Sequence, residues 1–320
     1  MQRLATLVSI GIAVAVISAA PTSQPAAKIS RVIIISIDGG RPDLLLRGDT
    51  PRIHSLFENG SYTFWARTTP GAVTLPAHVS MLTGVAPEVH GIMWNAELPL
   101  SEAVYPNAPT LFELAKRAGH STAMIATKAK FRVLAKPATI DWVFVPATGE
   151  SDDEQAAASA KKVIREHRPD VMFVHLGAVD IVGHAKGWGS PEQMQAVAAT
   201  DRNVGAILDA LSEQNLSDTT LVIVTADHGG AGRTHGPEDA RSRTIPWIAF
   251  GPGVRRGFDL TRLGGDFNVE TYDTFATACG VLGIPPPRRG SRGKFITQIL
   301  ENQDLVLPER PPKMDPTTRP

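Results

Sequence analysis

Six side chains of this sequence have the types and the spacing of metal ligands. They are Asp38, Asp180, His184, Asp227, His228 and His235. Asp180 and His184 stand four residues apart in DIVGH, so one helical turn places both on the same face. The glycines of TADHGG let the chain turn after Asp227 and His228, and His235 follows on a Gly-rich loop that could fold back over them. Three carboxylates and three imidazoles suit two zinc ions with open coordination positions, although such sites also accept manganese or iron.

A nucleophile for such a site lies in the segment TLPAH, residues 74–78. The hydroxyl of Thr74 could be a helix N-cap, and this alternative stays open beside a catalytic role. A threonine alkoxide bound to zinc would be a strong nucleophile at neutral pH. Asn95 in GIMWN could donate its amide to a phosphoryl oxygen. We expect His78 and His90 to fix this loop by hydrogen bonds rather than to bind metal.

The composition excludes several other classes of protein. The one cysteine, Cys279, cannot form an internal disulfide or a multi-cysteine metal cluster. The 32 Lys plus Arg residues balance 32 Asp plus Glu residues, so we expect no specific nucleic-acid binding. Hydrophobic residues make up 42% of the 320 residues, which excludes disorder over most of the chain.

The pattern of apolar residues predicts an α/β fold. Short apolar runs rich in β-branched residues are typical of strands covered on both faces, and they span residues 32–37, 171–176, 221–225 and 248–250. Helical patterns lie between them at residues 110–118, 154–166 and 191–213. This alternation predicts a sandwich around a parallel sheet, in which ligands bind beyond the carboxyl ends of the strands. Three of these strands lead to Asp38, Asp180 and Asp227, so the sheet would bring the three carboxylates together.

The two ends of the chain differ from its body. An apolar run over residues 4–20 and a Pro/Ser/Gln/Ala stretch to residue 27 are typical of an export signal, cleaved or retained as a membrane anchor, rather than of a buried helix. We expect an extracytoplasmic protein, periplasmic or secreted. The catalytic domain is predicted over residues 28–300, and the proline-rich tail over residues 301–320 is expected to be disordered.

The motifs in this order resemble the alkaline phosphatase superfamily and, within it, the type I phosphodiesterase/nucleotide pyrophosphatase family. The similarity spans about residues 30 to 285, from SIDGGRPD through TLPAHVSMLTGVAPEVHGIMWN and DIVGH to ADHGG, THG and IPWIAFGPGV. It implies a three-layer α/β sandwich with a mostly parallel sheet. It also implies one zinc bound by Asp180, His184 and His235, and a second bound by Asp38, Asp227, His228 and the nucleophile Thr74. Asn95 would take the phosphoryl oxygen.

The activity that the resemblance implies is hydrolysis of phosphodiester or pyrophosphate bonds through a phospho-threonine intermediate on Thr74. Positions 74 and 78 are Thr and His where formylglycine sulfatases of the superfamily carry Cys or Ser and Arg, which argues against a sulfatase. Only six residues separate His228 from His235, where larger relatives carry a long insertion. We therefore expect a reduced substrate cap, which puts a preference for nucleotides in doubt.

Two other functions stay open. A phosphomonoesterase or phosphonate hydrolase could use the same metal site, with Lys128 and Lys130 in TKAKF as added cations for the substrate. Phosphonoacetate hydrolases carry a similar Lys-x-Lys stretch, but both residues could also be solvated surface lysines. A non-catalytic zinc-binding protein is the third hypothesis, and a threonine at the nucleophile position argues against it.

Aromatic side chains add candidates for specificity. Trp94, Phe64 and Trp65 lie near the Thr74 loop in the sequence, so they could contact the substrate. Trp188 and Trp247 are expected to be packing residues. The substrate partner we expect is a small phosphate ester.

Overall fold

The computed structural model describes residues 29–98, 102–287, 290–305 and 307. The predicted export signal and residues 308–320 of the predicted tail lie outside the described residues. Among the described helices, none is long and apolar enough to cross a membrane.

Eight described strands form one sheet in the order β4-β3-β5-β1-β6-β7-β2-β8. Their bounds are β1 Arg31–Ile37, β2 Ser61–Arg67, β3 Thr122–Ile125, β4 Trp142–Phe144, β5 Val171–Leu176, β6 Thr220–Thr225, β7 Thr244–Phe250 and β8 Phe258–Asp259. The α-helices are α1 Pro42–Arg47, α2 Pro51–Glu58, α3 Thr74–Thr83, α4 Pro87–His90, α5 Leu111–Arg117, α6 Asp153–His167, α7 Ala178–Lys186, α8 Pro191–Glu213, α9 Ala240–Arg243 and α10 Thr271–Leu282. The described residues also form four short 3-10 helices: η1 Ala129–Leu134, η2 Ser217–Thr219, η3 Leu260–Leu263 and η4 Thr297–Ile299.

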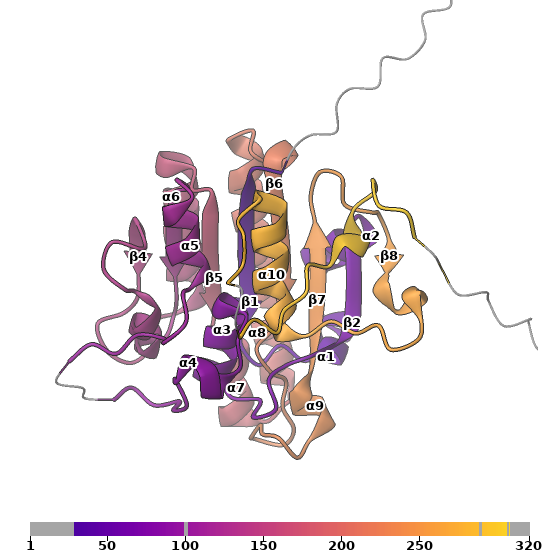
Figure 1. Cartoon of the computed structure of the whole chain (residues 1–320). Coiled ribbons are helices and arrows are strands. Elements are labelled where there is room, and N and C mark those ends of the chain that lie inside the picture. Colours follow the sequence, from indigo (N-terminus) through magenta and orange to yellow (C-terminus); the bar gives the residue numbers. More distant parts are fainter. Residues whose placement is uncertain (1–28, 99–101, 288–289, 306, 308–320) are drawn as a thin grey trace, which may run out of the picture.

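The sheet separates two apolar cores, as the continuous apolar run of β1 predicts. Val32 and Ile34 face a core that includes residues of α3, α5 and α10. Ile33, Ile35 and Ile37 face the opposite core, with residues of α2, α6 and α8. The result is a three-layer α/β sandwich with helices on both faces of the sheet (Figure 1).

The predicted strands and helices coincide with observed elements: α8 has the predicted bounds, and α5 is one residue shorter at each end than the predicted helix over residues 110–118. The sheet is mostly parallel, but β7 runs antiparallel between β6 and β2. The prediction of a mostly parallel sheet is confirmed, and the strand that contains residues 248–250 is the antiparallel one. Residues 226–243 connect β6 to β7 at one edge of the sheet without a long crossover helix, so the chain returns in the opposite direction.

Candidate active site

The predicted metal ligands gather where three parallel strands end. β1 lies between β5 and β6 and runs parallel to both, so their carboxyl ends lie side by side. Asp38 follows β1 directly, and Asp227 comes two residues after β6. Asp180 and His184 are in α7, the helix after β5, and an interval of four residues places them on one face.

The six side chains form two groups, and within each group the candidate ligand atoms lie within 4.8 Å of one another. One group is Asp180, His184 and His235, and the other is Asp38, Asp227 and His228. These are the two sets that the family resemblance implies. Each set draws on residues far apart in the sequence, so the order of the strands brings them together.

Unpaired buried oxygen atoms show that the two groups fit cations. Asp38 Oδ1, Asp180 Oδ1 and Asp227 Oδ2 are buried and have no hydrogen-bond partner among the described residues. Leaving such oxygens unpaired is costly. His228 Nε2 lies 3.3 Å from Asp38 Oδ1 and 3.2 Å from Asp227 Oδ2, so imidazole nitrogen and carboxylate oxygen converge as ligands of one ion would.

The three candidate histidines are held in the orientation that metal binding needs. Their Nδ1 atoms donate hydrogen bonds to backbone carbonyls: His184 to Arg233 at 3.0 Å, His228 to Gly229 at 2.8 Å and His235 to Ala72 at 2.8 Å. Each Nε2 atom therefore keeps its lone pair for a metal ion.

The electrostatics of the buried groups agree with this arrangement. Burial lowers the pKa of His228 to about 4, so its ring is neutral at pH 7, the form that binds metal. Burial, together with the charges of Asp38 and Asp180, raises the pKa of Asp227 well above its usual range. Cations at the site would remove this penalty and keep Asp227 ionised.

Trp188 packs beside the metal groups, as expected of a packing residue. Its ring meets that of His184 edge-on at 5.1 Å, and its Nε1 donates to the carbonyl of Gly39 at 3.1 Å. A Cβ atom at position 230 would lie 2.3 Å from this ring, which explains why residue 230 is glycine. Trp247 is also buried and donates to Thr274, away from the site.

Lys128 lies against the candidate metal ligands. Its Nζ is 2.7 Å from Asp38 Oδ2 and 2.6 Å from Asp180 Oδ2, and the side chain is buried. It is therefore not a solvated surface lysine. Because Lys128 holds the Oδ2 atom of each carboxylate, the Oδ1 atoms are left to face the histidines.

Replacement of Lys128 by arginine is expected to weaken metal binding about tenfold. The substitution keeps the positive charge but replaces one ammonium, which contacts both carboxylates, with a larger planar group. Affinity would be measured by competition with a fluorescent chelator, and Lys136→Arg, at an exposed lysine, is the matched control. Unchanged affinity in the Lys128 variant would show that the contact does not position these carboxylates.

His175 is a contributor to the site that sequence reasoning missed. Its Nε2 is 2.9 Å from Asp38 Oδ2, and its Nδ1 is 2.8 Å from Thr127 Oγ1. The signal in the sequence was a single imidazole within the apolar run of β5. The contact holds Asp38 Oδ2, whereas His228 lies at the other oxygen, Oδ1.

Thr74 is the first residue of α3, and its hydroxyl points at the second metal group. The N-cap position is Val73, with no side-chain capping bond, so the N-cap alternative for Thr74 is wrong. Thr74 is buried, and its Oγ1 lies 3.1 Å from His228 Nε2. A metal ion held by His228 would lie within reach of this hydroxyl.

Hydrogen bonds of two histidines hold α3 and the following loop in place, as expected. His78 Nε2 is 2.8 Å from Ser36 Oγ on β1, and His78 Nδ1 is 2.8 Å from the carbonyl oxygen of Thr74. His90 Nε2 is 3.1 Å from Ser80 Oγ. Neither histidine belongs to the two metal groups.

Asn95 is oriented by two donors. Its Oδ1 accepts from the backbone N–H of Leu75 at 2.9 Å and from Lys130 Nζ at 2.9 Å. The Nδ2 amide hydrogens are therefore free to donate to a substrate oxygen. Lys130 is half-buried rather than fully solvated, and burial lowers the pKa of its ammonium.

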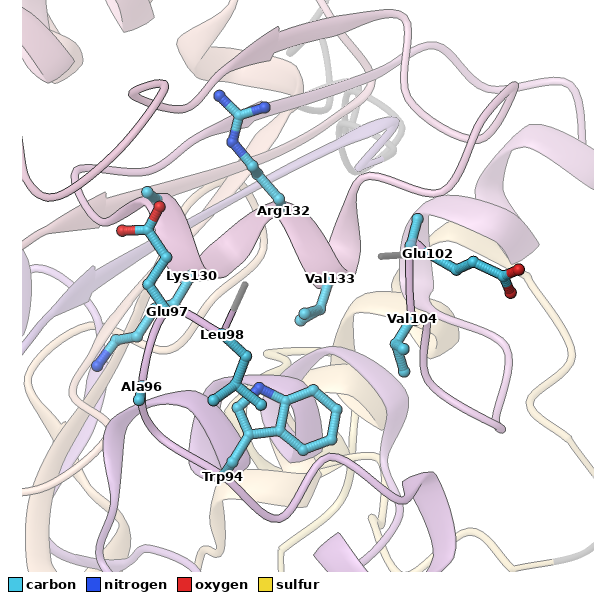
Figure 2. Close-up of a pocket in the computed structure, with 11 residues that line it drawn as sticks. Trp94, Ala96, Glu97, Leu98, Glu102, Val104, Lys130, Arg132 and Val133 are labelled. Carbon is cyan, nitrogen blue, oxygen red and sulfur yellow. The ribbon is translucent and has the colours of Figure 1, made fainter. Parts of the chain in front are cut away.

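A pocket of about 290 Å³ opens beside Lys130. Figure 2 shows its apolar wall, formed by Trp94, Leu98, Val104 and Val133. The other two aromatic candidates for specificity lie on β2, outside this pocket. Phe64 packs against Phe57 and Tyr62, and Trp65 is 66% exposed. Of the three candidates, the structure thus places only Trp94 at the pocket.

The fold and the site together define the class of protein. An α/β sandwich with two carboxylate–histidine groups at its strand ends, beside a buried threonine, has the layout of the alkaline phosphatase superfamily. A sequence profile of the type I phosphodiesterase / nucleotide pyrophosphatase family matches residues 32–236, and the chain belongs to this family.

The similar proteins are distant in sequence. An uncharacterized pyrophosphatase/phosphodiesterase of Schizosaccharomyces pombe is 26% identical over 63% of this chain and 45% of its own length. Family member 7 of the ectonucleotide pyrophosphatases/phosphodiesterases of Mus musculus is 25% identical over 68% of this chain and 54% of its own. The chain thus matches about half the length of these relatives.

Solved structures share the fold. Murine ectonucleotide pyrophosphatase / phosphodiesterase 5 superposes with a TM-score of 0.69 at 16% identity, covering 84% of this chain and 100% of that one. A second structure of the murine protein, an inactive threonine-to-alanine variant in complex with AMP, has the same TM-score and identity and covers 85% of this chain and 100% of that one.

Proposed function

We propose that the protein hydrolyses phosphodiester or pyrophosphate bonds with two zinc ions and Thr74 as the nucleophile. The observation that carries this proposal is the position of Thr74 Oγ1, buried and 3.1 Å from Nε2 of the candidate ligand His228. A binding protein would not need a hydroxyl there. The inactive threonine-to-alanine variant of the murine relative supports the same role for a threonine.

The residues divide the reaction between them. When bound, two divalent ions would act as Lewis acids that favour the alkoxide of Thr74 and stabilise charge on the phosphoryl group. Thr74 Oγ1 attacks phosphorus, and one ester or anhydride bond breaks to release an alcohol or a phosphate, which leaves a phospho-threonine. Water then cleaves the Thr74–phosphorus bond and restores the hydroxyl. Asp180, His184 and His235 would hold one ion, and Asp38, Asp227, His228 and Thr74 the other.

Asn95 would stabilise the phosphoryl oxygens through its free amide hydrogens. Replacement by alanine is expected to lower kcat by about 10² to 10³-fold, as loss of an oriented oxyanion donor does. The effect should fall mainly on kcat, because the charge on those oxygens grows in the transition state. Asn302→Ala, at an exposed position, is the control in the same assay. A change in KM alone would instead assign Asn95 to ground-state binding.

The test of the proposed function compares kcat/KM on bis-p-nitrophenyl phosphate and on p-nitrophenyl phosphate, with zinc present. A ratio well above one supports a diesterase. No hydrolysis of either ester in the zinc-loaded protein would contradict the proposal and leave a phosphonate hydrolase or the non-catalytic zinc-binding protein as alternatives.

A phosphomonoesterase or phosphonate hydrolase is the second candidate. The contact of Lys130 Nζ with Asn95 Oδ1 favours it, since it places an ammonium next to the amide that would bind the phosphoryl oxygen. A ratio of the two ester activities well below one, together with a raised KM for p-nitrophenyl phosphate in Lys130→Met, would support it. The ratio therefore discriminates a diesterase from a phosphomonoesterase, and a phosphonate hydrolase would be recognised by activity on a phosphonate alone.

We also propose that the enzyme acts outside the cytoplasm, on small phosphate esters. The apolar run over residues 4–20 supports export. Mass spectrometry of the protein recovered from the medium or the periplasm would test this, and recovery only from the cytoplasm with the N-terminus intact would contradict it.

A further inference from the structure

A second cavity, of about 540 Å³, lies at the other side of the metal groups from the Trp94 pocket. Three arginines line it, Arg67, Arg243 and Arg292. They come from β2, α9 and the segment after α10. Folding thus brings three guanidinium groups, distant in sequence, around one cavity, which we call the arginine cavity.

The guanidinium groups of the arginine cavity have no carboxylate partner among the described residues within 4.0 Å. Arg67 donates to Thr244 Oγ1 at 2.9 Å, and Arg292 lies 5.0 Å from the centre of the Tyr272 ring. Arg243 Nε is buried and has no hydrogen-bond partner in the described structure. Donors of this kind suit an oxyanion, which pairs with the planar guanidinium through two parallel hydrogen bonds.

Two carboxylates also line the arginine cavity, and in the described structure neither lies within 4.0 Å of a guanidinium nitrogen of these arginines. Glu270 is the N-cap of α10: its backbone carbonyl accepts the N–H of Asp273 at 2.9 Å, and its own N–H donates to Asp273 Oδ2 at 2.8 Å. Glu238 is exposed on the loop after His235. Three cationic groups against two such carboxylates leave the cavity with an excess of positive charge.

The topology places the arginine cavity at the same edge of the sheet as the metal groups. Arg67 ends β2, which runs parallel to β1, and Arg243 directly precedes the antiparallel β7. β2 is the third strand from β1 in the order β1-β6-β7-β2. At about 4.8 Å between neighbouring strands, the cavity lies roughly 10 to 15 Å from Asp38 and Asp227.

The wall of the arginine cavity is continuous with the metal site. Thr68 lines the cavity and donates its hydroxyl to the backbone carbonyl of Asp227. Its backbone N–H donates to the carbonyl of Arg243 at 3.1 Å. Pro237, on the same wall, follows the candidate ligand His235 by two residues.

We propose that the arginine cavity is a distal anion site, which binds a second anionic group carried by an alcohol portion of the substrate. This inference rests on the proposed function and narrows its substrate class to esters with a phosphate or carboxylate roughly 10 to 15 Å from the scissile phosphorus. The metal groups hold the reacting phosphoryl group, and the arginines hold the distant charge. The Trp94 pocket, on the opposite side, is left for the other alcohol portion.

The experiment uses phosphodiesters of p-nitrophenol with alkyl chains of increasing length that end either in a phosphonate or in a methyl group. In one series the alkyl chain belongs to the alcohol that stays on phosphorus in the first step. In the other series it is attached to the p-nitrophenol, which is the leaving group. At the chain length that reaches the arginine cavity, we expect kcat/KM to be about tenfold higher for the phosphonate-terminated ester than for the methyl-terminated ester. The gain should decrease at high ionic strength.

Arg243→Gln and Arg292→Gln should each lose most of this gain. The quantity compared is the ratio of phosphonate to methyl ester within each variant, so a general loss of activity cancels. Arg117→Gln, at an exposed arginine paired with Glu113, is the control and should keep the wild-type ratio. A ratio near one at all lengths, or a ratio that both substitutions leave unchanged, would overturn the proposal.

Failure of the proposed function is distinguishable from failure of the distal site. If the methyl-terminated esters are hydrolysed and the phosphonate-terminated esters show no higher kcat/KM, only the distal site is contradicted. If no ester is hydrolysed, binding of alkane bisphosphonates of the same lengths is measured by calorimetry. Affinities about tenfold weaker in both arginine variants would then support the distal site, and equal affinities would refute it.

Discussion

Thr74→Ala is expected to lower kcat/KM on bis-p-nitrophenyl phosphate by at least about 10³-fold, since it removes the nucleophilic oxygen. The side chain is buried and approaches the metal groups only through Oγ1, 3.1 Å from His228 Nε2. The six other candidate ligands remain, so the variant should still bind metal. Steady-state kinetics and the metal content of the dialysed protein would be measured together.

Thr74→Ser is the matched variant. It keeps the hydroxyl and loses one methyl group, so we expect activity within about a factor of 10 to 100 of the parent, the cost of a less restricted χ1 angle. Thr74→Ala that keeps full activity with its metal bound would exclude the phospho-threonine route.

Removal of metal ions with a chelator is expected to abolish activity and to lower Tm on the order of 10 °C. Three buried carboxylates with unpaired oxygens then face one another, and burial with mutual repulsion already raises the pKa of Asp227. Metal at about a thousand times its Kd contributes about 4 kcal/mol to the free energy of unfolding, which corresponds to a shift of this size.

Adding back zinc, manganese or iron separately would identify the metal that restores activity and Tm. Zinc is expected to restore both, because imidazole and carboxylate ligands in groups of three leave the open position that zinc hydrolases use. Full activity after chelation, with metal analysis showing an empty protein, would contradict the metal-dependent mechanism. Recovery with one metal equivalent would revise the number of ions.

The six candidate ligands could be predicted because the sequence encodes them locally, whereas their division into two sets came from the family resemblance. Each carboxylate follows an apolar strand, and in α7 the interval of four residues fixes the face that Asp180 and His184 share. The carboxyl ends of parallel strands meet at one edge, so the strand pattern predicted that the three carboxylates lie at that edge, and the order of the strands decided which of them are neighbours. Thr74 and Asn95 were recognised from their motif, and the structure adds that donors from Leu75 and Lys130 orient the amide of Asn95.

The order and direction of strands were decided by the tertiary structure. β7 is antiparallel, and no local pattern in residues 244–250 shows it, since a buried strand is apolar in either direction. The sequence also could not separate Trp94, which lines a pocket, from Phe64 and Trp65, which lie on β2, because nearness in the sequence does not show which side chains share a cavity.

Long-range contacts account for the remaining features. Lys128 and His175 meet Asp38 across more than 80 residues of sequence, and the arginine cavity joins residues 67, 243 and 292. Such contacts depend on which strands are neighbours, and only the folded sheet specifies that. By itself, the sequence determined the family, the candidate ligands and the nucleophile, because those depend on residue types at short spacing. The tertiary structure decided which charges surround them, since burial and partner choice arise only when distant elements pack.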